Sequence, residues 1–190
     1  HLHETNHIRK KSGCTLKTIN LSNNQISGVP DTFFHGCGEH LATLKLANNS
    51  LSTLEETIFS GLSSMKTLDL SGNRLTSTHI SKRLFQDLEQ LKELYLDHND
   101  LSNFEESDEV FVPMAGTLVV LKLNHNNIKV ISNRTFLSLN NLLELNLSHN
   151  QITSLDEPSF SGLESLKHLS LGHNQIVTIH EQSFQHCDKL

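Results

Sequence analysis

Seven copies of the pattern LxxLxLxxNxL constrain this chain more than any other feature. They start at residues 16, 41, 65, 91, 118, 142 and 166, with Met in the first position at residue 65, and Leu190 stands where an eighth copy would open. Successive starts lie 24 to 27 residues apart. Because one copy is too short to bury its own apolar residues, a repeat of this length predicts a solenoid in which each copy forms one coil and packs against its neighbours.

The copy LLELNLSHNQI shows the physical role of each position. Leu145 and Leu147 have the two-residue spacing that puts side chains on one face of a strand, so we expect a short buried strand here. Asn150 ends the strand, and its amide can donate to and accept from backbone groups of adjoining coils. We therefore predict a ladder of stacked asparagines, formed by Asn24, Asn49, Asn73, Asn99, Asn126, Asn150 and Asn174.

The phenylalanines give the same register independently. Seven of the nine recur once per repeat, which predicts a stacked apolar spine on the returning side of the coils. These are Phe34, Phe59, Phe85, Phe111, Phe136, Phe160 and Phe184. In repeats three and four the phenylalanine comes two positions later than in the others, so these two repeats carry an insertion.

Composition agrees with one elongated domain that forms part of a longer array. The hydrophobic content of 36% suits a thin solenoid, and the net charge of -6 argues against general nucleic-acid affinity. No run approaches the ~18 apolar residues that a bilayer helix needs, and the N-terminus has no apolar signal core. We assign residues 1–15 to a preceding repeat or flank, 16–189 to seven repeats and 190 to an eighth. Any membrane anchor is expected outside this segment.

Sequons and cysteines indicate the compartment. Asn-x-Ser/Thr sequons occur at Asn20, Asn48, Asn133 and Asn146, of which Asn48 is the weakest glycosylation candidate because it abuts the asparagine ladder. Cys14 lies about one coil upstream of Cys37, so a disulfide between adjacent coils is sterically feasible, with buried free thiols as the alternative. Cys187 then stays reduced or pairs beyond Leu190. Together these features favour a secreted or cell-surface protein.

The full pattern LxxLxLxxNxLxxLxxxxFxxL, which covers roughly residues 16 to 190, is similar to the typical class of extracellular leucine-rich repeats. The chain resembles a segment of a Toll-type receptor ectodomain or of a chaoptin-like adhesion protein. The resemblance implies an α/β-type solenoid, a curved leucine-rich-repeat horseshoe with a parallel concave β-sheet and a mostly irregular or short-helical convex side. It also implies recognition of other macromolecules without chemistry performed on them.

Outward strand positions on the concave sheet form the predicted binding surface. Strands ~4.8 Å apart give seven copies a surface roughly 30 Å long, enough for a protein epitope but too flat for a deep small-molecule pocket. The middle of the array is the most anchor-like part, because an aromatic residue lies there beside aliphatic ones. The candidates are Tyr95, Val119, Val120, Lys122 and Leu143. Scattered surface hydrophobes are the alternative interpretation, and a glycan on Asn146 would shield part of this patch.

A row of histidines precedes the ladder asparagine in four consecutive repeats: His98, His125, His149 and His173. At about the strand spacing, protonation of all four near pH 6 is unfavourable, so one hypothesis is a pH-sensitive or metal-binding rim. The other, which we favour, is that His-Asn suits this turn and that each imidazole is hydrogen-bonded locally. Imidazoles along a flat surface do not converge tetrahedrally as zinc requires, so no metal site is expected.

The insertions in repeats three and four are a second candidate surface, because insertions in solenoids map to one face. Repeat four carries an acidic cluster at Glu105, Glu106, Asp108 and Glu109. Lys82 and Arg83 lie one coil earlier and could pair with this cluster. A solvated loop without a partner is the alternative interpretation.

Enzymatic motifs are weak. The segment His3-Glu4-Thr5-Asn6-His7 matches HExxH, but no amphipathic helix surrounds it and no third zinc ligand is evident. The sequence has neither a Gly-rich phosphate loop nor a GxSxG elbow. We predict a protein that is not an enzyme and that needs no cofactor.

The function predicted from the sequence is protein–protein recognition by an extracellular module of a cell-surface receptor or adhesion protein. The partner is a protein ligand or a second, homophilic copy. A Toll-type innate immune receptor segment that recognises a protein or microbial ligand is the closest alternative. An intracellular leucine-rich-repeat scaffold is another, and it predicts unoccupied sequons and no disulfide.

Overall fold

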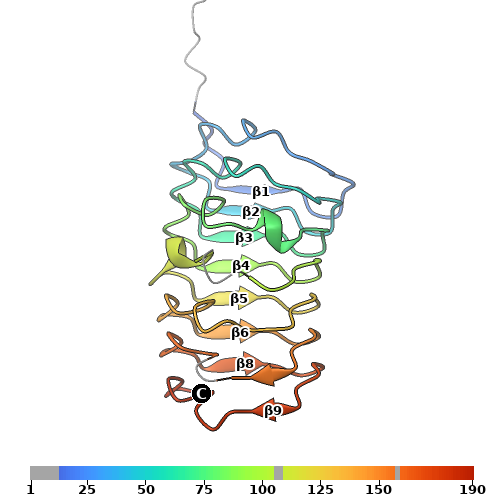
Figure 1. The fold of residues 1–190 in the computed structure, drawn as a ribbon. Coiled ribbons are helices and arrows are strands. Elements are labelled where there is room, and N and C mark those ends of the chain that lie inside the picture. Colours follow the sequence, from blue (N-terminus) through green and yellow to red (C-terminus); the bar gives the residue numbers. More distant parts are fainter. Residues whose placement is uncertain (1–12, 105–108, 157–158) are drawn as a thin grey trace, which may run out of the picture.

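The computed structural model describes residues 13–104, 109–156 and 159–190. Its main element is a parallel sheet of seven strands that stack in chain order along the solenoid (Figure 1). The strands are β1 (Thr18–Asn20), β2 (Thr43–Lys45), β3 (Thr67–Asp69), β4 (Glu93–Tyr95), β5 (Val120–Lys122), β6 (Glu144–Asn146) and β8 (His168–Ser170). This arrangement confirms the predicted leucine-rich-repeat solenoid with a parallel sheet.

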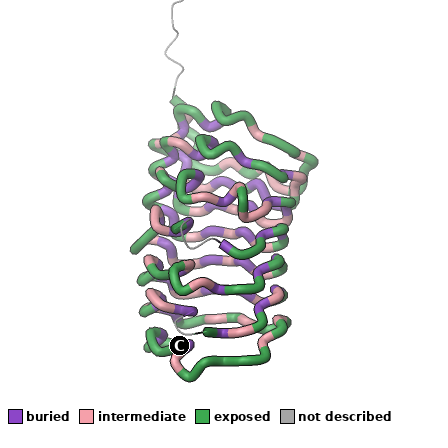
Figure 2. The backbone as a smooth tube through the Cα atoms, in the orientation of Figure 1, coloured by how far each residue is buried: buried purple, intermediate pink, exposed green. Residues whose placement is uncertain are grey.

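Each strand aligns with the equivalent position of the next repeat. Leu94 of β4 pairs with Leu121 of β5, which pairs in turn with Leu145 of β6. This central residue points inward and is fully buried in these three strands, while the residues on either side of it point outward. Within the main sheet, β1 and β8 alone have a half-buried central residue, because the described part of the chain places a neighbouring coil on only one side of each. Figure 2 shows more exposed chain in the coils at the two ends than in the middle.

The core behind the sheet contains the predicted phenylalanine spine. Six of its seven members are at most 1% exposed: Phe34, Phe59, Phe85, Phe111, Phe136 and Phe160. Neighbouring rings approach face to face where the geometry allows, as at Phe160 and Phe184, whose centroids are 5.4 Å apart. Phe184 is 38% exposed because it lies in the last coil. The rings of the spine thus pack between coils, because one repeat alone cannot bury them.

The returning side of the coils is made mostly of turns. Among the described residues, the 3-10 helices η1 (Ser77–His79) and η3 (Val112–Met114) lie in the two repeats that carry insertions. A second small parallel sheet joins β7 (Ser154–Leu155) to β9 (Thr178–Ile179). Within the ranges given above, no helix has the length and apolarity needed to cross a membrane.

Lys82 of the first insertion pairs with the second insertion across the edge of the solenoid, as predicted: its ammonium lies 3.0 Å from a Glu109 carboxylate oxygen. Arg83 instead lies 3.6 Å from Glu56, which belongs to the second repeat and not to the acidic cluster. All four side chains are about half exposed or more, so these ion pairs add little stability. The other acidic residues of the predicted cluster, Glu105, Glu106 and Asp108, lie outside the described residues.

Candidate protein-interaction surface

The outward face of β3 and β4 carries a hydrogen-bonded group around Tyr95. Its hydroxyl donates to Glu93 Oε2 at 3.3 Å, and the Thr67 hydroxyl donates to the same oxygen at 3.2 Å. Burial raises the pKa of Tyr95, and the charges of Glu93, Asp69 and Glu144 raise it further. The phenol therefore stays neutral and is held in place by a carboxylate, which leaves its half-buried ring as a preorganised contact.

The same face continues onto β5 and β6 as a mixed apolar and charged patch. Val119, Val120 and Leu143 are half-buried, and the Leu143 N–H donates to the Val119 carbonyl at 2.9 Å. The Lys122 ammonium forms an ion pair with Glu144. Register places Lys122 between Tyr95 and Asn146 in neighbouring strands. The structure thus brings the five sequence-predicted contact residues together: Tyr95, Val120 and Lys122 lie in β4 and β5, and Val119 and Leu143 directly precede β5 and β6.

Two acidic members of this surface were missed by the sequence reasoning. Glu93 and Glu144 occupy the outward position two residues before Tyr95 and Asn146, and Val120 stands between them in the register. The signal was available, because this position points outward in every repeat. Their partners could not be read from the sequence, since which neighbour a long side chain meets depends on rotamers as well as on register.

The asparagine ladder follows the C-terminal ends of the strands in the main sheet. Asn126 donates through Nδ2 to the carbonyl oxygens of Leu96 and Leu123, each at 3.0 Å, and to that of Asn124. Its Oδ1 accepts the N–H of Leu101 at 3.0 Å. The Leu96 and Leu101 groups belong to the preceding coil, so each amide joins two coils. Equivalent bonds across coils recur at Asn49, Asn73, Asn99, Asn150 and Asn174.

The four histidines of the predicted row are exposed and stack face to face. Ring centroids are 4.1 Å apart for His98 and His125, 4.0 Å for His125 and His149, and 4.1 Å for His149 and His173. The interpretation favoured from the sequence is that each imidazole is hydrogen-bonded locally. Among these four described rings, that holds for His98, whose Nδ1 lies 2.9 Å from Asp97 Oδ2. In the described part, no group of three or more His, Cys, Asp or Glu is arranged to hold a metal ion.

The four sequon asparagines differ in accessibility. Asn20 and Asn133 are exposed. Asn48 is also exposed, but its Nδ2 donates to Asn23 Oδ1 at 3.0 Å. Asn146 is half-buried in β6, and its Oδ1 accepts from both the N–H and the hydroxyl of Ser148. The Asn20 Oδ1 likewise accepts the Ser22 N–H, at 3.0 Å. Asn20 and Asn133 are the favoured glycan sites because both are exposed and the Nδ2 of neither is described as bonded.

The three cysteines fall into two kinds. The structure joins Cys14 and Cys37 in a disulfide that links the chain just before the first repeat to the returning side of that repeat. Cys187 is free and buried, with its Sγ 4.0 Å from the Phe160 carbonyl oxygen. Burial raises the pKa of this thiol, and Asp188 adds to the effect. The Cys187 thiol is therefore protonated at neutral pH and inert compared with an exposed thiolate.

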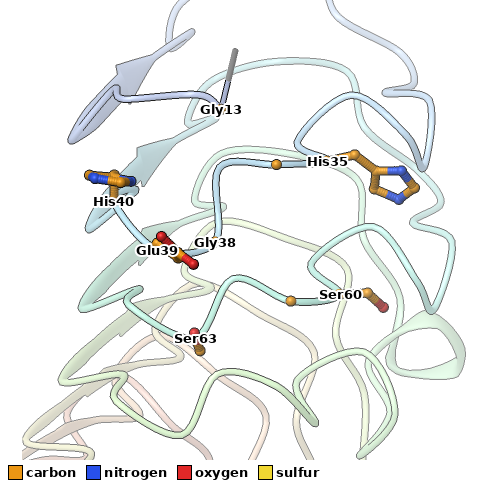
Figure 3. A pocket seen from close by; sticks show the side chains of 9 residues that line it. Gly13, His35, Gly38, Glu39, His40, Ser60 and Ser63 are labelled. Carbon is orange, nitrogen blue, oxygen red and sulfur yellow. The ribbon is translucent and has the colours of Figure 1, made fainter. Parts of the chain in front are cut away.

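A shallow hollow lies beside the N-terminal coils, lined by His35, Glu39, His40, Ser60 and Ser63 among others. Figure 3 shows that these side chains do not converge, because His40 and Glu39 lie at one end and His35 and Ser60 at the other. No nucleophile is placed against a base there. The HExxH segment at residues 3–7 lies outside the described residues.

The repeats and their parallel sheet define a leucine-rich-repeat protein-interaction module. The chain belongs to the leucine-rich-repeat family, whose model matches residues 14–75, 39–101, 116–176 and 150–190. Epiphycan from Gallus gallus is 35% identical over 74 residues, which cover 39% of this chain and 22% of epiphycan. Human leucine-rich repeats and immunoglobulin-like domains protein 3 is 33% identical over 122 residues, which cover 64% of this chain and 10% of that protein.

Similar solved structures include the crystal structure of a TLR13-ssRNA13 complex, with a TM-score of 0.80 and 31% identity. The match covers 92% of this chain and 25% of that one. Epiphycan and the immunoglobulin-like relative are extracellular or cell-surface proteins, and the comparisons indicate no enzymatic family. The expectation that nucleic acid is not a ligand is not confirmed, because the TLR13 structure is a complex with single-stranded RNA. This chain spans only a small part of each of these proteins.

Proposed function

We propose that this segment is an extracellular recognition module of a cell-surface receptor or adhesion protein, and that it binds a protein partner through the outward face of β4, β5 and β6. The observation that carries the proposal is the patch centred on Tyr95. It combines a fixed aromatic ring with the half-buried Val119, Val120 and Leu143 and with the Lys122–Glu144 ion pair. Aromatic and aliphatic anchors inside a polar rim are typical of protein-binding hot spots.

The Cys14–Cys37 disulfide and the exposed Asn20 and Asn133 sequons support an extracellular location. Disulfides persist in oxidising compartments, and N-glycans are added in the secretory pathway. The relatives found outside the cell or at its surface agree with this location. An intracellular scaffold would keep both thiols reduced.

A Toll-type receptor segment is the second candidate function, and the similarity to TLR13 over 92% of this chain favours it. A protein remains the proposed ligand. The outward face holds the carboxylates of Asp69, Glu93 and Glu144, and the net charge of the chain is -6, both unfavourable for contact with a phosphate backbone.

The test is binding of the multimerised segment to an array of cell-surface ectodomains that includes the segment itself, with single-stranded RNA as a separate probe. For a partner so found, we expect Tyr95→Ala and Leu143→Ser each to weaken binding more than tenfold, as hot-spot truncations do. Val130→Ser is the matched control, because Val130 is 50% exposed and lies off the sheet. Full binding by both sheet variants, or a preference for the RNA probe, would refute the proposed surface.

A further inference from the structure

The histidine stack has a geometry that the turn alone does not explain. Its rings are parallel to within 17° at every step, and the residues follow β4, β5, β6 and β8. All four have φ between 53° and 56°, in the left-handed region. The N–H groups of His98, His125 and His149 donate to carbonyl oxygens of the next coil, at 2.9–3.0 Å. Backbone bonds between coils thus hold each ring over its neighbour.

The backbone at this position does not require an imidazole. The equivalent residues of the first three repeats are Asn23, Asn48 and Gly72, with φ of 60°, 52° and 62°. Asn and Gly are the residues that tolerate the left-handed region best. The left-handed turn therefore explains why no β-branched residue stands here. It leaves four consecutive histidines unexplained.

Protonation changes the sign of the interaction between these rings. Neutral imidazoles stack favourably, whereas imidazolium rings about 4 Å apart repel one another well within the screening length of ~8 Å at physiological salt. His125 is the second ring of the stack, and its neighbours shift its pKa. Desolvation lowers the pKa of His125, and the charges of the other three histidines lower it further, whereas the carboxylate of Asp97 raises it. Asp97, which lies beside His98, therefore favours a charged ring, whereas a charge on one ring of the stack opposes a charge on the next.

We infer that the histidine stack is an acid-sensitive joint between the coils that carry β4 to β8. Neutral rings keep the stack intact, whereas acid that charges neighbouring rings makes them repel and loosens this edge of the sheet. The pKa of His125 is lowered in the folded chain, so unfolding favours proton binding at this ring. The stability that the neutral His125 contributes is therefore complete above the unfolded-state pKa of about 6.5, and it is lost as the pH falls through the folded-state pKa. This joint belongs to the solenoid itself and does not depend on which partner the module binds.

The experiment compares the wild-type segment with His125→Asn/His149→Asn by chemical denaturation between pH 8 and pH 5, together with NMR titration of the imidazole protons. Asn keeps the left-handed backbone, as at Asn23 and Asn48. The control is His35→Asn/His40→Asn, which removes two exposed histidines outside the stack.

We expect the denaturation midpoint of the wild type and of the control to fall more steeply below pH 7 than that of the stack variant. We also expect the His125 imidazole to titrate over a wider pH range than an isolated histidine does, because a proton on a neighbouring ring disfavours its own. Identical pH dependence in all three proteins, or independent single-site titration of His125, would overturn the inference.

Discussion

At the residue scale, a single ladder asparagine satisfies four backbone groups. Asn126 is 6% exposed and donates to three carbonyl oxygens while it accepts one N–H. In Asn126→Ala these groups stay buried without partners, so we expect the free energy of unfolding to fall by about 2–4 kcal/mol. Chemical denaturation measures this change. Asn140→Ala, at an exposed position, should change stability by less than about 0.5 kcal/mol. An equal loss in both variants would contradict this role of the ladder.

The positions of the ladder and of the phenylalanine spine could be predicted from the sequence, because both follow from the spacing of one residue type along the chain. The contacts of Tyr95 with Glu93 and of Lys122 with Glu144 could not. They join long side chains that have several rotamers each, and the sequence does not say which neighbour is met. The left-handed backbone of the histidines was also missed, although Asn and Gly in the same column were the available signal.

At the element scale, successive coils approach so closely that some positions have no room for a side chain. A Cβ at Gly38 would lie 1.9 Å from the Gly61 carbonyl oxygen, which is backbone of the next coil. We expect Gly38→Ala to push these coils apart and to destabilise the segment by about 1–3 kcal/mol. A Cβ at Gly28 would meet nothing within 4 Å, so Gly28→Ala should be neutral or stabilising by up to about 1 kcal/mol. Thermal denaturation of both variants distinguishes an effect of close packing at Gly38 from a general effect of replacing glycine by alanine.

The strands were predictable as elements because alternating leucines recur in every repeat, and the insertions were predictable from the displaced Phe85 and Phe111. The pairing of Lys82 with Glu109 was one of two interpretations that the sequence left open. The small sheet of β7 and β9 was not predicted. Its residues include Ser154 and Thr178, which lack the leucine spacing that marks the main strands.

At the scale of the whole molecule, the solenoid follows from the period alone, whereas the ligand does not, since recognition is spread over outward positions that no motif encodes.

The proposed location makes a prediction about the intact protein from its native source. Glycosidase treatment should lower its mass through loss of glycans at Asn20 or Asn133. Peptides with Cys14 and Cys37 should be cross-linked until reduction, while Cys187 reacts with an alkylating agent only after unfolding. Bare sequons together with reduced Cys14 and Cys37 would instead favour the intracellular scaffold.

Each strand of the main sheet is bonded only to the strands of adjacent coils, and this determines how the segment responds to mechanical load. A force that pulls on the chain ends meets one interface at a time, so coils detach singly while the others keep their contacts. Each detached coil of 24 to 27 residues releases roughly 80–95 Å of extended chain. The Cys14–Cys37 disulfide withholds the length between these residues from the first coil. A protein built this way between two surfaces lengthens stepwise under tension and absorbs work at each step.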